Sequence, residues 1–457
     1  MADIFISYAS EDRDRVMPII KALEEQGWST WWDSSSIPVG KTWRQFIKEG
    51  LEQARCILVI WSKKSISSDW VIEEADFGKD KKILVPALID DVRPPLGFGQ
   101  VQAARLMPWK KESGSPEFEK LLKALSDILG LPKTKVIKDD IPAPVQSELT
   151  KLAQALDTAI PPKSDDSNLL IATWNLRNFG SLNPKWTAEP NDTPKRDLRG
   201  LLAICEIVSR FDIIAIQEVM GDQRALRDMV NYMGSKWSFL MTQSTLGPSG
   251  NEERLAFVFD TSRLQLYGLV DQVVVPVEWL GKISETAMNR QFVRNPYVIN
   301  FRRKEKEFIL LTLQINYGDA PSERILELKS IAQLVADWAN RLFARDQNLI
   351  TLGDFNIDRE GDPLWQAFTS TGLTVPDDLM TVQRSIFDNP NKLSLDKYYD
   401  QIGWFQNDSG SIALSMTYRK GGGFDFLPYV YLDINLSKTA ISWRISDHYP
   451  LWVEFEV

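Results

Sequence analysis

Acidic and amide side chains recur at or just past the ends of apolar, strand-like segments in the C-terminal part of the chain. Taken singly, Asn and Asp often cap helices or make turns. The set consists of Asn175, Glu218, Glu253, Asp354, Asn356, Asp400, Asp447 and His448. Together they suit Mg²⁺ or Mn²⁺ chemistry on a phosphate, because Mg²⁺ prefers hard oxygen ligands and needs only one or two carboxylates. Amides can also donate to phosphate oxygens without adding negative charge.

His448 is the only histidine in 457 residues. A lone histidine is more often an ordinary surface or core residue than a catalytic one. Its place in the segment "ISDHYP", among these acids and amides, favours a catalytic role. An imidazole there could orient or deprotonate a water molecule while a carboxylate holds its other nitrogen.

Strands must position these residues. Apolar runs such as "LLIATWNL", "DIIAIQEV" and "NLITLGDFNID" predict strands, and the helical stretches "RDLRGLLAICEIVSRF" and "RILELKSIAQLVADWANRLFAR" lie between them. Many strands with two long helices predict an α+β layered sandwich over residues 168–457, with its chemistry at the strand ends.

The N-terminal part follows another pattern. Over residues 1–130, apolar strands such as "CILVIWS" and "KILVPALI" alternate with helical segments such as "PEFEKLLKALSDIL". Strands without polar alternation are typical of a parallel sheet that is buried on both faces. We therefore predict a doubly wound α/β domain over this range.

Residues 131–167 are rich in proline and charge, which predicts a linker. Within it, "SELTKLAQALDTAI" places Leu149, Leu152, Ala153 and Leu156 on one face of a short amphipathic helix. Such a helix either packs on a neighbouring domain or mediates self-association.

Composition narrows the class of protein. Hydrophobic residues make up 44% and charged residues 25%, as in soluble globular proteins. With no visible signal peptide and no apolar run long enough for a bilayer, we expect a cytoplasmic protein with no membrane partner. Cys56 and Cys205 lack metal-ligand spacing, which indicates a reducing compartment. The net charge of −9 disfavours broad nucleic-acid binding but leaves a local basic patch open.

Residues 168–457 resemble the endonuclease/exonuclease/phosphatase superfamily, whose type member is pancreatic-type deoxyribonuclease. The resemblance rests, in order, on "IATWNLRNFG", "DIIAIQEV", "NEERLAF", "LITLGDFNID", "YDQIGWF" and "SDHYP". It implies a four-layered sandwich. It also implies metal binding by Asn175 and Glu218 with Asp447 beside the metal or the attacking water, phosphate binding by Asp354 and Asn356, and pairing of Asp400 with His448.

The chain departs from the deoxyribonuclease branch at one catalytic position. That branch has a second histidine, paired with the glutamate that matches Glu253, where this chain has Gln314 in "LLTLQINYG". An amide can hydrogen-bond Glu253 but cannot exchange a proton near neutral pH, and loss of one general acid costs about 10²–10⁴-fold in rate. Met220 and Asn251 replace two residues that grip the minor groove in that branch. We therefore expect metal-dependent phosphoester chemistry with weak activity on duplex DNA.

Residues 1–130 resemble a TIR domain through "DIFISYASED", "WWDSSSIPVGKTW", "CILVIWSKKSISSDWVIEE" and "ILVPALIDDVRPPLGFGQVQAARL". Some TIR domains only assemble, whereas others cleave NAD⁺ at the nicotinamide–ribose bond. The enzymatic group has a glutamate four residues after a tryptophan, here Glu74 and Trp70. The resemblance also implies contacts on the nicotinamide side from Ala9, Ser10 and Ser35, and TIR–TIR assembly through the "SSSIPVG" loop.

A carboxylate at Glu74 suits this reaction, because breaking an N-glycosidic bond builds positive charge on the ribose that a fixed carboxylate stabilises. Nicotinamide is already a cationic leaving group, so no general acid is needed. The alternative is a solvated acid on a helix, since Glu73 and Asp76 lie beside it in the sequence.

Three functions follow from these patterns. The first is a bacterial defence-type effector that hydrolyses NAD⁺ to nicotinamide and ADP-ribose, or a cyclic variant, with a metal-dependent phosphodiesterase or nuclease-like domain as second effector. In the second, the TIR domain is only a scaffold, and the C-terminal domain acts alone on nucleic acid or a phosphorylated metabolite. In the third, the C-terminal domain only senses a nucleotide. NAD⁺ consumption separates the first from the second, and metal-dependent phosphoester turnover separates the first from the third.

Overall fold

The computed structural model describes residues 3–32, 50–52, 54–107, 116–129, 141–164, 167–242, 253–272, 295–315, 321–343, 348–388, 397–405 and 414–457. The chain forms two compact units, Met1–Val136 and Ile137–Val457. In the described ranges, no helix is both long enough and apolar enough to cross a membrane.

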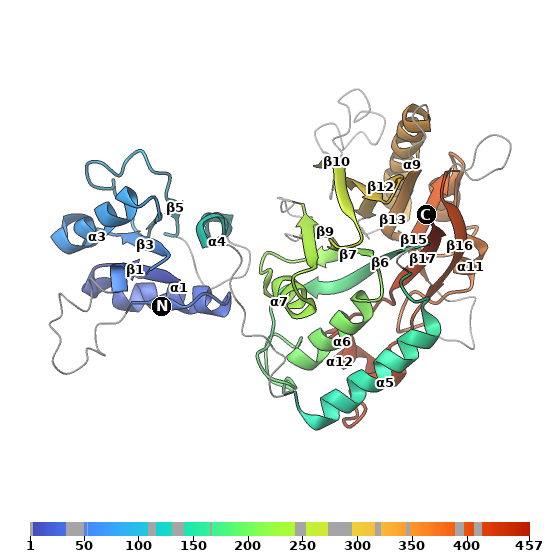
Figure 1. Cartoon of the computed structure of the whole chain (residues 1–457), viewed down its shortest axis with the longest axis horizontal. Helices are drawn as coiled ribbons and strands as arrows, with labels where there is room; N and C mark the ends of the chain where they lie inside the picture. The colour runs from blue at the N-terminus through green and yellow to red at the C-terminus, as the bar shows by residue number, and fades with distance from the viewer. Residues whose placement is uncertain are drawn as a thin grey trace. The chain divides into compact units, whose positions relative to one another are not determined.

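The first unit is built around one parallel sheet with the strand order β2-β1-β3-β4-β5. Its strands are β1 (Ile4–Ser7), β2 (Thr30–Trp31), β3 (Cys56–Trp61), β4 (Leu84–Leu88) and β5 (Ala104–Arg105). Alternate residues of a strand point to opposite faces. Leu58 and Ile60 of β3 accordingly share a core with α1 (Arg13–Glu25) and α4 (Pro116–Leu129). Val59 and Trp61 pack instead with α3 (Asp69–Asp80) on the other face. The predicted doubly wound α/β fold is confirmed (Figure 1).

The second unit contains two six-stranded sheets. The β6 sheet has the order β16 (Thr417–Gly423), β17 (Leu451–Glu456), β6 (Asn168–Phe179), β7 (Ile213–Val219), β9 (Arg254–Asp260) and β8 (Trp237–Met241). The β13 sheet has the order β10 (Gln265–Gln272), β11 (Tyr297–Arg303), β12 (Lys306–Gln314), β13 (Asn348–Ile357), β15 (Tyr398–Phe405) and β14 (Leu373–Thr374).

Four layers result from the two faces of each sheet. Leu169 and Ile171 of β6 pack against the β13 sheet in an inner core. Leu170 and Ala172 point the other way, into a core shared with α6 (Leu198–Val208) and α7 (Arg224–Met233). On the outer face of the β13 sheet, α9 (Pro321–Phe343) and α10 (Pro363–Thr369) close the sandwich. This is the predicted four-layered arrangement, with α6 and α9 on opposite outer sides (Figure 1).

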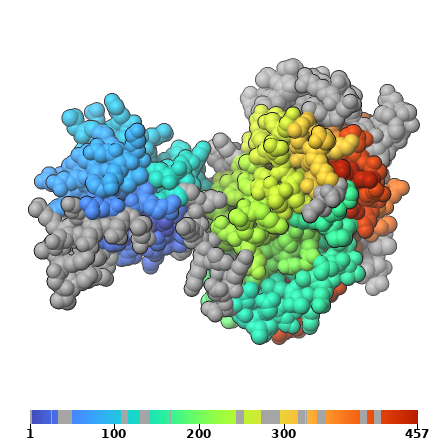
Figure 2. All heavy atoms as spheres, viewed as in Figure 1, coloured from blue at the N-terminus to red at the C-terminus, as the bar shows by residue number. Residues whose placement is uncertain are grey.

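The amphipathic helix expected within the linker is α5 (Ala143–Ala159), and it lies inside the second unit. Leu149, Leu152 and Leu156 are buried in the same core as α6. The buried carboxylate of Glu148 also accepts a hydrogen bond of 3.0 Å from Nε of Arg199 on α6. The apolar face of α5 is thus covered by its own chain, while its polar face forms part of the surface of this unit (Figure 2).

Candidate functional site

Irregular backbone gathers at the strand ends where the polar set was predicted. The pairing register shifts between Asn175 and Phe179 on β6 and between Asp354 and Ile357 on β13. Four residues at these ends and at the end of β7 have left-handed backbone conformations: Arg177 (φ 35°), Asn178 (φ 50°), Glu218 (φ 59°) and Asn356 (φ 49°). Such conformations cost about 1–3 kcal/mol each and cluster at functional sites, because bulged ends re-aim side chains.

Asn175 connects the two sheets at this edge. Its Nδ2 donates to Oε1 of Glu218 on β7 at 2.9 Å and to Oδ2 of Asp354 on β13 at 3.1 Å. Nε2 of Gln314, at the end of β12, donates to the same Glu218 oxygen at 3.3 Å. Residues from four strands therefore meet in one cluster of carboxyl and amide groups.

Asp354 is buried in this cluster, with 2% of its surface exposed. Burial raises the pKa of its carboxyl group to about 7, against the opposing charge of His448 and the N–H of Asn356, which donates to Oδ1 at 3.0 Å. The negative charge of Asp400 adds to the rise. A cation bound here would relieve the concentration of negative charge.

Hydrogen bonds hold both the imidazole and the backbone of His448. Its Nδ1 lies 2.6 Å from Oδ2 of Asp400, as predicted for the pair. Its backbone N–H donates to Oγ of Ser446 at 2.9 Å, and that hydroxyl donates to the carbonyl of Asn175 at 2.5 Å. Burial alone would lower the pKa of His448, but the carboxylates of Asp400, Asp354 and Asp447 together raise it well above its ordinary value.

The residues present fit an oxygen-preferring divalent cation by donor chemistry. In the part of the chain that the structure describes, no three His, Cys, Asp or Glu side chains are grouped as a metal site. Mg²⁺ needs only one or two carboxylates and keeps its remaining water ligands. Glu218 and Asp354 supply those carboxylates. The buried Oε1 of Gln314 and Oδ1 of Asp400 also accept no hydrogen bond from the described residues, which leaves acceptors for bound water.

The other predicted members flank this cluster. Asn356 is buried, and its Nδ2 donates to the carbonyl of Ile315 at 2.6 Å. Glu253 is buried immediately before β9. Asp447 is partly exposed and lies 3.2 Å from Nη1 of Arg177. Two positions differ from the residues that grip the minor groove in the deoxyribonuclease branch. At the first, Met220 packs so close to Gly180 that a Cβ atom added to Gly180 would lie 2.7 Å from the Cβ of Met220. The second, Asn251, lies outside the described residues.

Sequence reasoning missed Arg196, which holds the strained segment after Asn175. The buried guanidinium donates to the carbonyls of Leu176 at 2.6 Å, Arg177 at 2.9 Å and Asn178 at 2.8 Å. It also donates to the carbonyl of Ile445 at 2.9 Å, just before the His448 segment. Arg196 is the first residue of a helical stretch predicted from the sequence and matches no motif, so only the fold reveals its role; the helix itself begins at Leu198.

The first unit contains a separate pocket of about 620 Å³. Its walls combine aromatic side chains with hydroxyl and charged groups, and it is lined by Phe5, Ile6, Tyr8, Ala9, Ser10, Glu11, Trp31, Trp32, Lys64, Ser67, Ser68, Trp70, Val71 and Glu74. Four of the predicted residues, Ala9, Ser10, Trp70 and Glu74, therefore line one cavity. Ser35 lies outside the described residues. A concave space in which aromatic side chains and several polar groups converge is a candidate small-molecule site.

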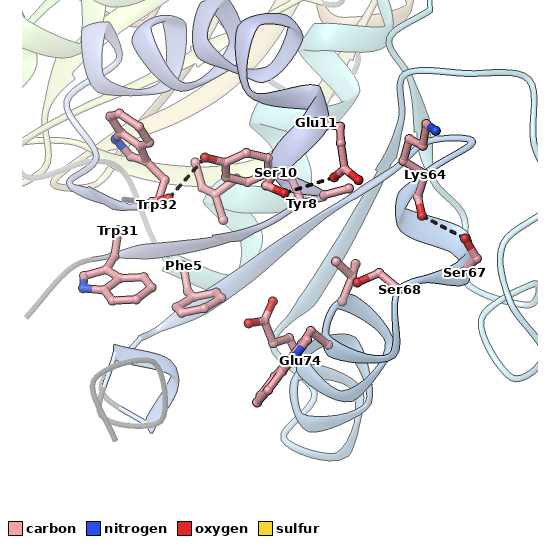
Figure 3. Close-up of a pocket in the computed structure, with 14 residues that line it drawn as sticks. Phe5, Tyr8, Ser10, Glu11, Trp31, Trp32, Lys64, Ser67, Ser68 and Glu74 are labelled. Carbon is pink, nitrogen blue, oxygen red and sulfur yellow. Dashed lines mark hydrogen bonds between the residues drawn. The ribbon is translucent and has the colours of Figure 1, made fainter. Parts of the chain in front are cut away.

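The Glu74 carboxyl group points from α3 into this pocket (Figure 3). Burial raises its pKa to about 7, with the Ser7 hydroxyl opposing the rise and the charge of Glu73 adding to it. Phe5 and Trp31 stack beside it with ring centroids 4.8 Å apart. Glu74 is thus not the solvated surface acid that its acidic neighbours in the sequence had left as an alternative.

Comparison with known proteins supports this division of the chain. Residues 4–122 match the TIR domain model, and residues 172–426 match that of the Endonuclease/Exonuclease/phosphatase family. The chain is 26% identical over 309 residues to a deoxyribonuclease of Thioalkalivibrio sp., across 65% of this chain and 73% of that protein.

Two TIR relatives match over shorter stretches. The chain is 39% identical over 75 residues to the 2′ cyclic ADP-D-ribose synthase AbTIR of Acinetobacter baumannii, across 16% of this chain and 28% of that protein. It is 34% identical over 91 residues to the NAD(+) hydrolase TcpC of Escherichia coli, across 18% and 30% respectively. The chain thus spans less than a third of the length of these two relatives. It carries an N-terminal TIR domain and, by the match over most of its length, belongs to the endonuclease/exonuclease/phosphatase family.

Proposed function

We propose that the TIR domain cleaves NAD⁺ at the nicotinamide–ribose bond, with Glu74 as the catalytic carboxylate. The observation that carries this proposal is the Glu74 carboxyl group inside an aromatic pocket, where its pKa is raised to about 7. The relatives named NAD(+) hydrolase and 2′ cyclic ADP-D-ribose synthase support it. Both free ADP-ribose and a cyclic variant are products compatible with this cleavage.

The pocket favours this chemistry electrostatically. A cationic nicotinamide ring between the aromatic walls would lower the pKa of Glu74 and so favour its ionised form. As the glycosidic bond breaks, positive charge moves onto the ribose, and a carboxylate in a desolvated site stabilises that charge more strongly than it would in water. Ala9 and Ser10 lie on the pocket wall that follows β1.

We further propose that the C-terminal domain is a metal-dependent phosphodiesterase. The His448–Asp400 contact of 2.6 Å carries this proposal, because it fixes an imidazole beside a cluster of carboxyl groups. Asp400 holds Nδ1, so Nε2 is the nitrogen left to accept a proton from water or to bind a phosphate oxygen. Asn356 and the amide of Asn175 would orient the phosphate.

Asn175 and Glu218 would hold Mg²⁺ or Mn²⁺ at this edge, with the carboxyl group of Asp354 next to them and Asp447 beside the metal or the attacking water. The cation, when bound, neutralises charge on the phosphate and polarises the bond that breaks. Calorimetry on the full chain should show Mn²⁺ binding that Glu218→Ala weakens by at least about tenfold, since removing a ligating carboxylate from such a site costs affinity on that scale. Equal Mn²⁺ affinity in the two proteins would overturn the ligand assignment.

The two activities together suit a defence-type effector in which TIR assembly controls NAD⁺ consumption and the second domain adds phosphoester cleavage or nucleotide sensing. The decisive experiment incubates the purified full chain with NAD⁺, and separately with a phosphodiester substrate, with and without Mg²⁺. Nicotinamide release supports the first activity. Its absence, together with Mg²⁺-dependent phosphoester cleavage, would leave the TIR domain as a scaffold.

A further inference from the structure

An exposed tryptophan lies beside the phosphoester site. Trp443 directly follows α12 (Lys438–Ser442) and has 42% of its surface exposed. The guanidinium carbon of Arg177 lies 4.0 Å from the centroid of its ring. The same guanidinium is 3.2 Å from Oδ2 of Asp447, the residue next to His448. A single side chain, that of Arg177, therefore connects Trp443 to the predicted catalytic segment around His448.

Arg177 is fixed in this position rather than swinging freely. Its Nη1 donates to Oγ of Ser442 at 2.7 Å, and its backbone N–H donates to Oδ1 of Asn175 at 2.9 Å. The guanidinium therefore lies over the Trp443 ring, which is still 42% exposed. Arg contributes both a charge and a planar surface to such a pair.

A second exposed aromatic borders the same segment. Phe387 has half of its surface exposed and follows Ile386, whose N–H donates to the carbonyl of Asp447 at 2.9 Å. An antiparallel bridge also joins Ser385 to His448. Trp443 and Phe387 thus both lie next to the strand-like segment that carries the imidazole. Large exposed aromatics beside a polar reaction centre are well suited to a ligand with a flat apolar part and an anionic part.

We propose that Trp443 is a stacking platform for an unpaired nucleobase whose attached phosphate is processed at His448. This inference rests on the proposed phosphodiesterase function and adds the class of substrate. A base in a closed duplex is covered by its neighbours on both faces, whereas an unpaired base exposes a face that stacks on an aromatic ring regardless of its identity. The chemistry is shared by two sources: single-stranded nucleic acid, and a free small nucleotide such as the ADP-ribose that the first domain would release.

Binding can be measured without turnover, on the full chain in EDTA. Calorimetric titrations would use a thymidine hexamer, a hexamer of the same backbone without bases, a blunt closed-ended hairpin duplex, and ADP-ribose. We expect Trp443→Ala to weaken binding of the thymidine hexamer by about tenfold, as aromatic truncation does at stacking sites. The base-free hexamer and the duplex should bind the variant as they bind the wild type, and Trp443→Phe should retain most of the affinity.

Tyr267→Ala is a matched control. Tyr267 is similarly exposed and also lies under an arginine, with the guanidinium carbon of Arg302 4.1 Å from its ring centroid. Tyr267 belongs to β10, next to Arg302 of β11. Arg302 pairs with Glu307 near the start of β12, whereas the phosphoester site lies at the other end of β12, at Gln314. Its truncation should leave all four affinities unchanged.

The outcomes separate the inference from the function it rests on. A loss confined to the hexamer with bases names single strands as the source, and a loss confined to ADP-ribose names the free nucleotide. The proposal is overturned if Trp443→Ala weakens the base-free hexamer equally, or if no base-bearing ligand loses affinity. If the wild type cleaves no phosphodiester with Mg²⁺, the proposed enzymatic function is wrong. The binding differences test the stacking proposal independently of that result.

Discussion

Glu74 and Asp354 share a property that neither shows in the sequence, since burial raises the pKa of each to about 7. An acid of this kind is half protonated near neutral pH, and acids with such shifts are often found at functional sites. The proposed cleavage of NAD⁺ needs the ionised form of Glu74. At Asp354 the carboxylate requires a positive partner.

The raised pKa of Glu74 predicts a pH profile for NAD⁺ cleavage. In the free enzyme, kcat/KM should fall as pH drops below about 7, because protonation removes the charge that stabilises the ribose cation. Glu74→Gln should abolish nicotinamide release, measured by chromatography, without unfolding the protein. Persistence of wild-type release in this variant would show that another group performs the chemistry.

The same shift makes a prediction about stability. A folded-state pKa above the ordinary value means that the native protein binds more protons than the unfolded chain between about pH 4.5 and 7. Stability contributed by protonated Glu74 is therefore lost as pH rises through that window. Glu74→Gln should melt higher than the wild type at pH 8 and show a smaller difference at pH 5, in matched thermal scans. A difference in melting temperature between the two proteins that does not change with pH would contradict this explanation.

The lone imidazole and its missing partner predict opposite effects of two substitutions. His448→Ala should remove phosphodiesterase activity. Gln314→His should raise cleavage of duplex DNA by at least about tenfold, because it restores a group able to protonate the leaving oxygen near Glu253. Initial rates on a duplex substrate with Mg²⁺ measure both. Efficient wild-type cleavage that Gln314→His leaves unchanged would mean that protonation there does not limit the rate.

At the scale of elements, the site depends on strand ends that leave regular geometry. Asn175 and Asp354 are the last residues in regular register before the bulges of β6 and β13, and a hydrogen bond of 3.1 Å joins them across the two sheets. Arg196 holds the left-handed residues that follow Asn175. Its buried guanidinium donates hydrogen bonds to the carbonyls of residues 176–178. Hydrogen bonds from one buried side chain thus offset the backbone strain of this segment.

Arg196→Met should therefore destabilise the second unit by about 3 kcal/mol, because it leaves several buried carbonyls without donors. Its phosphodiesterase kcat should fall as the Asn175 segment relaxes, while NAD⁺ cleavage stays at the wild-type rate. Urea titration and paired activity assays would test this. Lys195→Gln, at the partly exposed neighbouring residue, is the control and should change neither quantity. Equal loss of both activities in Arg196→Met would indicate general misfolding instead.

At the scale of the whole molecule, two compact units with separate cores carry two chemically different sites. The sites share no residue, since the pocket lies entirely within residues 5–74 and the His448 cluster within residues 175–448. We expect Glu74→Gln to abolish nicotinamide release while phosphodiester cleavage continues, and His448→Ala to do the reverse. Loss of both activities in either variant would reveal coupling between the units.

Much of the fold was readable from the sequence because local patterns set it. Apolar runs without alternation predicted the parallel sheet around β3, and ordered motifs predicted the layered sandwich and the pairing of Asp400 with His448, later found at 2.6 Å. Helical periodicity also placed the apolar face of α5, although the helix proved to be integral to the second unit.

Tertiary structure alone decided the rest, because these properties arise between residues that are distant in the chain. The pKa values of Glu74 and Asp354 depend on what buries them, and no local pattern records burial. The role of Arg196 depends on carbonyls brought to it from residues 176–178 and 445. The contact of Trp443 with Arg177, which is far earlier in the sequence, likewise exists only in the folded chain. Sequence patterns determine elements through local periodicity, whereas electrostatics and contacts across the chain exist only once the elements have packed.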